Sequence, residues 1–314
     1  MDSTLSTFAF NSSIMLQDAN QPFYPYYPNE LIDTIPALLS LVLTFAILVI
    51  LILTKSYTDP LHKMVFFLIL ADFLFSLSLL VSLVNTPSSS VECKTTIYIS
   101  AFGRTSSFFW SASFAHALMK VMEANNFTPV ERLGKYYTTF SLSLPAIIAL
   151  VFVSTPLVVY NPDGKRCGRY VTIGQFDYSY FLLSGVPLLL SCVMSIYFYL
   201  RTGWHIKSFL AKESGMAREL LVLMIYPATM IVCWLPYLIW SLVYMFIDLD
   251  RDLAVIPKFC LGLHGFLNSL TYGLSKKTRE DLKMLCAKSQ PADNSQQTEP
   301  QATVTQELSY VDEL

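Results

Sequence analysis

Long apolar stretches separated by short polar turns run through most of the chain. A helix needs about 20 mostly apolar residues to cross roughly 30 Å of hydrocarbon. Seven stretches meet this requirement, approximately over 31–53, 63–85, 94–120, 137–160, 177–200, 219–247 and 253–274. The pattern therefore predicts an all-α membrane protein, a bundle of seven transmembrane helices. The third stretch contains many serines, one histidine and one arginine, so we expect it to face other helices rather than lipid.

The predicted spans divide the chain into four regions. Residues 1–30 are polar and rich in Pro and Tyr and are predicted to form an outer tail, and residues 31–274 hold the spans. Residues 275–288 are predicted to form a short amphipathic helix, with leucines towards the membrane and basic residues at the lipid headgroups. Residues 289–314 are polar with few core-forming side chains, which predicts a disordered tail.

The basic residues are shared unevenly between the two ends of the predicted spans. With the N-terminus outside, two thirds of the 21 lysines and arginines fall on the inner side. Cytoplasmic loops are enriched in Lys and Arg, so this bias favours an outer N-terminus and an inner C-terminus. The glycosylation sequon at Asn11 then lies outside, as glycosylation requires. The sequon at Asn126 would lie inside, and we interpret it as chance.

Composition argues against several classes of function. Apolar residues make up 54% of the chain and charged residues 14%, whereas soluble domains carry about 25% charged residues. The formal net charge of −2 gives no reason to expect nucleic acid as a partner. The spans show no catalytic set at one depth and no set of three metal ligands, so the sequence predicts neither an enzyme nor a metal or cofactor site. We interpret the lone histidines His116 and His264 as hydrogen-bonded packing residues.

Two cysteines fall on the outer side, away from the helix interiors. Cys93 lies at the outer end of the third span, and Cys167 lies in the outer loop after the fourth. The remaining cysteines are placed within spans or on the inner side: Cys192, Cys233, Cys260 and Cys286. Exposed extracellular thiols tend to oxidise, so a Cys93–Cys167 disulfide would tie this loop over the mouth of the bundle. Two separate thiols are the alternative.

Two charged side chains are predicted near the middle of the membrane. Arg104 lies 11 residues below Cys93, and Asp72 lies at a comparable depth in the second span. A central arginine costs at least ~2.5–3.5 kcal/mol on insertion scales, so it needs an interior partner. One interpretation is a permanent Asp72–Arg104 ion pair that fixes two helices. A second places Arg104 on the floor of a pocket, facing a phosphate or carboxylate of a ligand. A water-filled cavity with neither pairing is the third.

A tryptophan and a proline lie close together in the sixth span. Pro236 removes a backbone donor and clashes with the preceding turn, which predicts a kink. Trp234 beside that kink would transmit the presence of a ligand by swinging the inner end of the helix, although static packing at the kink is the alternative. The loop over 201–217 carries Arg201, Lys207 and Lys212 and is the predicted docking face for a cytoplasmic partner.

With these cysteines and seven spans, the chain resembles the G-protein-coupled receptor superfamily. Residues 68–72 (LILAD) resemble the LxxAD element of rhodopsin-like receptors, and residues 233–236 (CWLP) match their CWxP element. Residues 268–272 (NSLTY) look like the NPxxY element with Ser in place of Pro. The chain departs from the pattern at residues 120–123, where Lys-Val-Met-Glu stands in place of Asp-Arg-Tyr.

A second resemblance extends over the third to seventh spans by short motifs. Residues 131–137 (ERLGKYY), leading to Leu144-Pro145, are similar to the entry of the fourth helix in the cyclic-AMP-receptor-like group of protists. Residues 264–266 (HGF), followed by Ser269 and Tyr272, and the Cys-Trp pair of the sixth span are similar to the same group.

The resemblance implies a plasma-membrane receptor that binds a small extracellular ligand inside the bundle and activates a heterotrimeric G protein by movement of the sixth helix, with no cofactor. It implies a switch formed by Trp234, Pro236, Asn268 and Tyr272. It also implies a G-protein face with the following members: Lys120, Glu123, Arg201, Lys207, Lys212 and Arg218. The alternative is a seven-helix transporter or channel, against which the chain shows no internal repeat.

Overall fold

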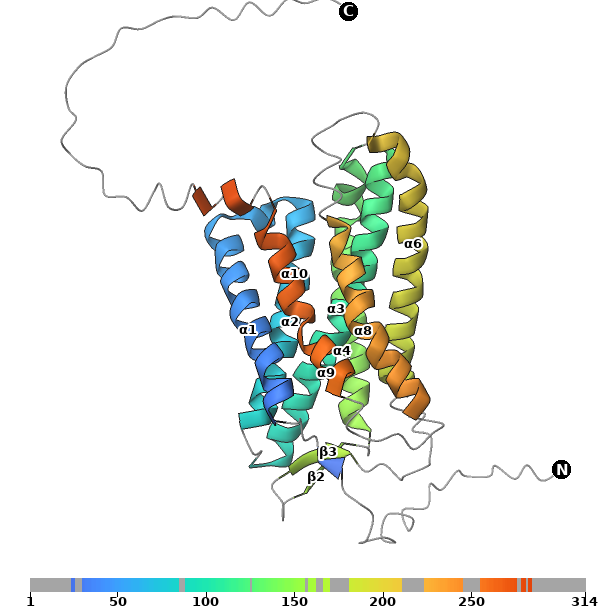
Figure 1. The fold of residues 1–314 in the computed structure, drawn as a ribbon. Helices are drawn as coiled ribbons and strands as arrows, with labels where there is room; N and C mark the ends of the chain where they lie inside the picture. The colour runs from blue at the N-terminus through green and yellow to red at the C-terminus, as the bar shows by residue number, and fades with distance from the viewer. Residues whose placement is uncertain are drawn as a thin grey trace, which may run out of the picture.

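The fold is a bundle of helices with a small sheet at one end (Figure 1). The computed structural model describes residues 24–25, 30–84, 88–124, 126–155, 158–161, 166–169, 181–210, 223–244, 255–275, 278–280 and 282–283. The α-helices are α1 (Glu30–Leu53), α2 (Pro60–Val84), α3 (Ser90–Ala124), α4 (Thr128–Ser154), α6 (Val186–Leu210), α8 (Ile225–Tyr244), α9 (Val255–Gly262) and α10 (His264–Gly273). A 3₁₀ helix, η2 (Ser56–Thr58), joins α1 to α2, and a π-helix, η3 (Phe181–Gly185), leads into α6.

Every predicted span overlaps one or more of these helices. Five of the helices in the described ranges are long and apolar enough to cross a membrane, namely α1, α2, α4, α6 and α8. The prediction of a largely helical protein with long apolar helices is therefore confirmed. The helix α4 begins at Thr128 rather than near residue 137, because Pro129 suits a first helical turn and the Asn126 side chain accepts a hydrogen bond from the Thr128 amide.

The helix α3 is the centre of the bundle. It has 35 residues and contacts α2, α4, α6 and α8. Its serines and threonines are mostly buried, as are Phe108, Trp110 and Phe114. Its polar side chains in the middle of the helix therefore face other helices, as the sequence predicted.

Close helix packing depends on glycine at two places. A Cβ at Gly103 of α3 would lie 2.8 Å from the backbone nitrogen of Phe75 and 3.0 Å from the carbonyl oxygen of Ala71, both on α2. A Cβ at Gly265 of α10 would lie 2.3 Å from the Ser40 hydroxyl of α1. Since contacts below about 3 Å force atoms apart, these glycines set the spacing of α2–α3 and of α1–α10.

Gly103→Ala is expected to destabilise the protein by about 1–3 kcal/mol, because the clash involves backbone that no side-chain rotation relieves. Gly134→Ala on α4 is the matched control, since nothing lies within 4 Å of its Cβ position. This control should be neutral or up to about 1 kcal/mol more stable, because alanine favours helix. Thermal unfolding of the purified variants measures both, and equal melting temperatures would contradict the close approach of α2 and α3.

The last predicted span is not one continuous helix. The α-helical pattern stops at Gly262 and resumes at His264, with Leu263 between α9 and α10. Gly262 packs on Pro36 of α1, and Gly265 packs on Ser40 of the same helix. Two glycines weaken the helix here while their packing draws the backbone towards α1, which accounts for the break.

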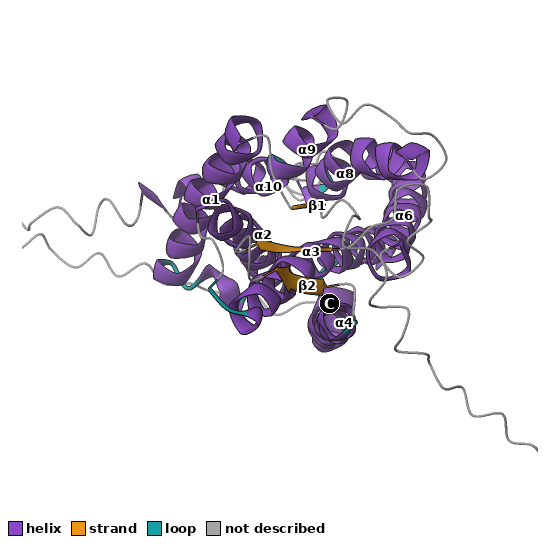
Figure 2. Cartoon of the chain, turned by 90° about the horizontal axis from the view of Figure 1, so that it is seen from below, coloured by secondary structure: helices purple, strands orange, loops and turns teal. Residues whose placement is uncertain are grey.

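A three-stranded antiparallel sheet lies at the end of the bundle where α3 begins and α4 ends (Figures 1 and 2). Its strands are β1 (Tyr24–Pro25), β2 (Val158–Asn161) and β3 (Arg166–Arg169), in the order β1-β3-β2. The hydrophobic pattern of the chain predicts no strands. Strands of two to four residues are too short to give an alternating pattern, and β1 pairs with a segment far along the chain.

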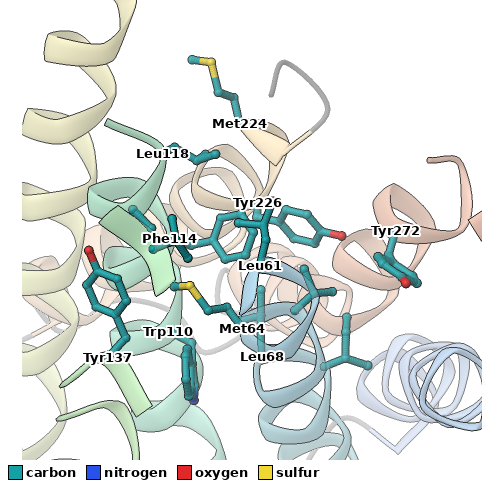
Figure 3. Close-up of a cluster of buried hydrophobic side chains, with 14 of the residues drawn as sticks. Leu61, Met64, Leu68, Trp110, Phe114, Leu118, Tyr137, Met224, Tyr226 and Tyr272 are labelled. Carbon is teal, nitrogen blue, oxygen red and sulfur yellow. The ribbon is translucent and has the colours of Figure 1, made fainter. Parts of the chain in front are cut away.

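The opposite half of the bundle is filled by large apolar side chains (Figure 3). Phe114 of α3 packs against Tyr226 of α8, with ring centroids 5.2 Å apart. Around them lie Leu61, Met64 and Leu68 of α2, Trp110 and Leu118 of α3, Tyr137 of α4, Tyr272 of α10, and Met224. This apolar cluster closes the end of the bundle that lies away from the sheet.

The segment after α10 is partly described. Residues 278–280 and 282–283 are helical, and the Thr278 hydroxyl donates to the carbonyl oxygen of Tyr272 at 2.8 Å. Leu274 and Leu282 are exposed, as expected for side chains that meet lipid. The tails at residues 1–23 and 284–314 lie outside the described residues.

Candidate functional site

The site is centred on Asp72 of α2, whose side chain is buried in the middle of the bundle. Its Oδ1 atom accepts a hydrogen bond from the Ser107 hydroxyl of α3 at 2.6 Å. Its Oδ2 atom accepts one from Nδ2 of Asn268 on α10 at 2.7 Å. Nδ1 of His264, also on α10, lies 3.3 Å from Oδ1. One carboxylate thus joins α2, α3 and α10.

Asn268 extends this connection to α8. Its Oδ1 atom accepts a hydrogen bond from the Thr229 hydroxyl at 2.6 Å. Its Nδ2 atom lies 3.3 Å from Nε2 of His264 while it donates to Asp72. Because the amide NH₂ only donates and a carboxylate only accepts, this arrangement fits the histidine tautomer with its proton on Nδ1. The Asp72 network, defined as Asp72, Ser107, Thr229, His264 and Asn268, therefore links four helices.

The helix α1 meets the edge of this network. The Ser76 hydroxyl of α2 donates to the Ser40 hydroxyl of α1 at 2.9 Å, and both side chains are buried. The position of a Cβ at Gly265 lies against both Ser40 and the Asp72 side chain. Since α10 approaches so closely here, a change in the position of α10 would disturb α1 and α2 together.

Trp234 of α8 packs directly against the Asp72 network. It is fully buried, and its ring meets Phe108 of α3 edge-on, with centroids 4.4 Å apart. The rings of Trp234 and His264 are 6.0 Å apart at an angle of 76°. Pro236 lies two residues further along α8, inside the helix. The structure thus brings Trp234 and Asn268 of the predicted switch together through His264.

Tyr272, the last residue of the predicted switch, lies one helical turn below Asn268. Its side chain is buried, and its ring lies 6.0 Å from that of His62 at the start of α2. It belongs to the apolar cluster shown in Figure 3. Of the predicted switch residues, Asn268 thus lies in the Asp72 network, Trp234 packs against it, and Tyr272 lies one turn further along α10 in the apolar cluster.

The described residues hold no Asp72–Arg104 ion pair, which was one of three interpretations of these buried charges. Arg104 is buried on α3. Gly103 and Ser107 lie one turn apart on the side of α3 that faces α2, and Ser107 bonds the carboxylate. Arg104 is rotated from Gly103 by about 100° around the helix. Gly103 lies level with Ala71 and Phe75, so Arg104 and Asp72 are at a similar height in the bundle, but a sequence pattern leaves the rotation of each helix about its axis undetermined.

The two cysteines of the predicted disulfide lie on α3 and β3, the elements that meet at the sheet end of the bundle. Cys93 is buried in the first turn of α3 and does not carry a free thiol. Cys167 lies on β3, opposite Tyr160 of β2. The free cysteines of the described ranges are Cys192, Cys233 and Cys260. The pairing of Cys93 with Cys167 stays a prediction.

The predicted G-protein face is partly neutralised by its own charges. Glu123, near the end of α3, accepts from Lys120 of the same helix at 2.7 Å and pairs with Arg201 of α6 at 2.8 Å. The Glu123–Arg201 ion pair therefore connects α3 to α6. Lys207 falls within α6, and its side chain, together with Lys212, Arg218 and Asn11, lies outside the part of the chain that is described.

Sequence reasoning missed Ser107 and Thr229 as members of the Asp72 network. The available indication was their polarity within otherwise apolar helices, which many other serines and threonines share. The interpretation of both intramembrane histidines as hydrogen-bonded packing residues is confirmed. His264 contacts Asp72, and Nδ1 of His116 lies 2.8 Å from the Tyr137 hydroxyl.

The chain was compared with known protein families and with curated proteins. No family model matches it, and no curated protein matches it. Membership of a receptor superfamily therefore stays a prediction that depends on the motifs and on the geometry of the site.

Proposed function

We propose that the protein is a seven-helix G-protein-coupled receptor of the plasma membrane, with its N-terminus outside. The α3 helix and the α9–α10 pair complete the bundle formed by the five apolar helices. Two features support the inclusion of α3: its length of 35 residues and its central contacts with four helices. In this orientation, the sheet lies at the extracellular mouth and the apolar cluster lies at the cytoplasmic end.

The observation that carries the proposal is the contact of Trp234 with the Asp72 network beside a proline in α8. Below Trp234, Thr229 of α8 is bonded to Asn268, and above it Pro236 interrupts the hydrogen bonds of the helix. A proline permits a helix to bend at a defined place. A ligand that displaces Trp234 would therefore bend α8 and weaken its connection to α10.

Bending of α8 has a defined consequence at the inner end. Tyr226 of α8 packs against Phe114, and Met224 belongs to the same apolar cluster (Figure 3). Movement of the inner part of α8 would separate these side chains and expose a surface between α3 and α8. That surface, beside Glu123 and Arg201, is the proposed docking site of the G protein. The ligand-facing interpretation of Arg104 belongs to the same proposal, with an anionic group as its partner.

The proposal is tested by nucleotide exchange on purified heterotrimeric G proteins. The full chain would be reconstituted in lipid nanodiscs after an unbiased ligand screen in a heterologous cell with a G-protein dissociation readout. An active ligand should accelerate exchange in the purified system, and an N-terminal tag should be stained on intact cells. Substrate flux in proteoliposomes without any accelerated exchange would favour the transporter or channel instead.

The proposed disulfide gives a prediction of its own. Cys93→Ser and Cys167→Ser should each destabilise the protein by about 2–4 kcal/mol and lower surface expression, and the double variant should be no worse than either single. Cys260→Ser is the matched control, because Cys260 is a free, half-buried thiol. Surface labelling of tagged variants and thermal unfolding measure these effects, and losses that simply add would refute the pairing.

A further inference from the structure

The helix α4 has an exposed face that runs along its length. Phe140, Ile147, Leu150 and Val151 are 46–58% exposed and lie on one side of the helix, at spacings of one or two turns. Among the five apolar helices, α4 is the least buried, and Figure 2 shows it outside the ring of the other helices. An exposed apolar face on such a helix is a lipid-facing surface.

At the inner end of α4 the same face becomes basic. Arg132 and Tyr136 lie one turn apart and continue the line towards Phe140, and Lys135 lies beside them. All three are exposed, Tyr136 by 72%. Within the described ranges the side chains of Arg132 and Lys135 take part in no ion pair or hydrogen bond, whereas Lys120 and Arg201 both pair with Glu123.

The length of α4 places these residues at the edge of the hydrocarbon. The helix has 27 residues, or about 40 Å at 1.5 Å per residue, which exceeds the bilayer core of roughly 30 Å. With the apolar outer part inside the core, the excess of about seven residues at the N-terminal end of α4 extends into the headgroup layer. Tyr136 then lies at the boundary, where tyrosine is enriched.

We propose that Arg132, Lys135 and Tyr136 bind the headgroup of an anionic phospholipid whose acyl chains lie along the apolar face of α4. The guanidinium of Arg132 would hold two phosphate oxygens, Lys135 would add a second positive charge, and the Tyr136 hydroxyl would donate to the phosphate. The assignment to the inner leaflet rests on the orientation given under the proposed function, but the site itself does not. Glu131 is exposed on the same turn and opposes the binding of an anion.

The direction of this face favours a lipid over a protein partner. The basic side chains continue a line of residues that faces the bilayer, away from the charges of α3 and α6 that border the proposed G-protein site. A soluble partner would have to enter the headgroup layer to reach them, whereas a phospholipid already lies there with its phosphate at this depth.

The test measures lipid retention by the purified full chain. The nanodiscs would contain phosphatidylcholine and a minor fraction of phosphatidylinositol bisphosphate, with the same mixture in both leaflets. Native mass spectrometry after extraction would count the anionic lipids that stay bound to the protein. Each basic residue near an anionic surface strengthens binding by about fivefold, so Arg132→Gln with Lys135→Gln should weaken retention roughly 30-fold. Glu131→Gln should strengthen it several-fold.

Lys94→Gln is the matched control, because Lys94 is an exposed lysine near the other end of the bundle and should leave retention unchanged. Soluble inositol trisphosphate should compete poorly, since it lacks the chains that the apolar face holds. Equal retention by the double variant and the wild type, or equal loss with Lys94→Gln, would overturn the proposal. Since both leaflets carry the lipid and no G protein is present, this outcome is independent of receptor activity.

Discussion

Asp72→Leu is expected to destabilise the bundle by about 2–4 kcal/mol, because Ser107, His264 and Asn268 all lose their acceptor. The loss exceeds that of a typical interhelical hydrogen bond, since one carboxylate serves donors from two helices. Thermal unfolding of the purified protein in detergent measures the effect. Asp59→Asn is the control. Asp59 is exposed at the start of α2, and an asparagine side-chain oxygen can still accept from the Leu61 amide, so only the contact with His62 is altered and stability should change by less than about 1 kcal/mol.

Double variants distinguish a hydrogen bond of Asp72 with Asn268 from an ion pair of Asp72 with Arg104. Asp72 and Asn268 share a hydrogen bond, so the losses from Asp72→Leu and Asn268→Leu should be less than additive when combined. Asp72 and Arg104 form no ion pair, so the double variant Asp72→Leu with Arg104→Leu should lose roughly the sum of the singles. If this second double variant were more stable than either single variant, Asp72 and Arg104 would be an ion pair in the wild type, which would contradict the geometry of the network.

Trp234→Ala is expected to cost about 3–5 kcal/mol of stability and to abolish the ligand response. The fully buried ring packs against Phe75, Phe108 and His264, so its removal leaves a cavity beside the Asp72 network. Trp234→Phe should retain much of the edge-on packing against Phe108 and cost less. Stability is measured by thermal unfolding, and the response by ligand-stimulated nucleotide exchange.

Trp110 provides a control of matched burial. It is also fully buried on α3 and stacks on Phe67 with ring centroids 5.3 Å apart, but it does not contact Trp234 or His264 in the described geometry. Trp110→Ala should lose a similar amount of stability while the folded fraction keeps its response. Equal loss of response per folded molecule in both variants would mean that Trp234 packs the core without acting as a switch.

The candidate site was only partly predictable from the sequence. Asp72, Trp234 and Asn268 were predicted as functional residues from their motifs, and all three lie in or against the network. The partners of Asp72 were not predictable, because a periodic pattern gives depth along a helix and leaves its rotation undetermined. His264 was predicted to be hydrogen-bonded, but its partner on α2 lies 192 positions earlier in the chain, beyond the reach of local patterns.

The sequence by itself determined the long apolar helices and the position of prolines within α4 and α8, since length, hydrophobicity and the missing proline N–H are local properties. Only the tertiary structure decided that Ser107 rather than Arg104 faces Asp72, that β1 pairs with β3, and that Glu123 joins α3 to α6. These features depend on how each helix is rotated and on which distant segments meet. Packing sets both, as at Gly103, where the approach of two backbones fixes which side of α3 points towards α2.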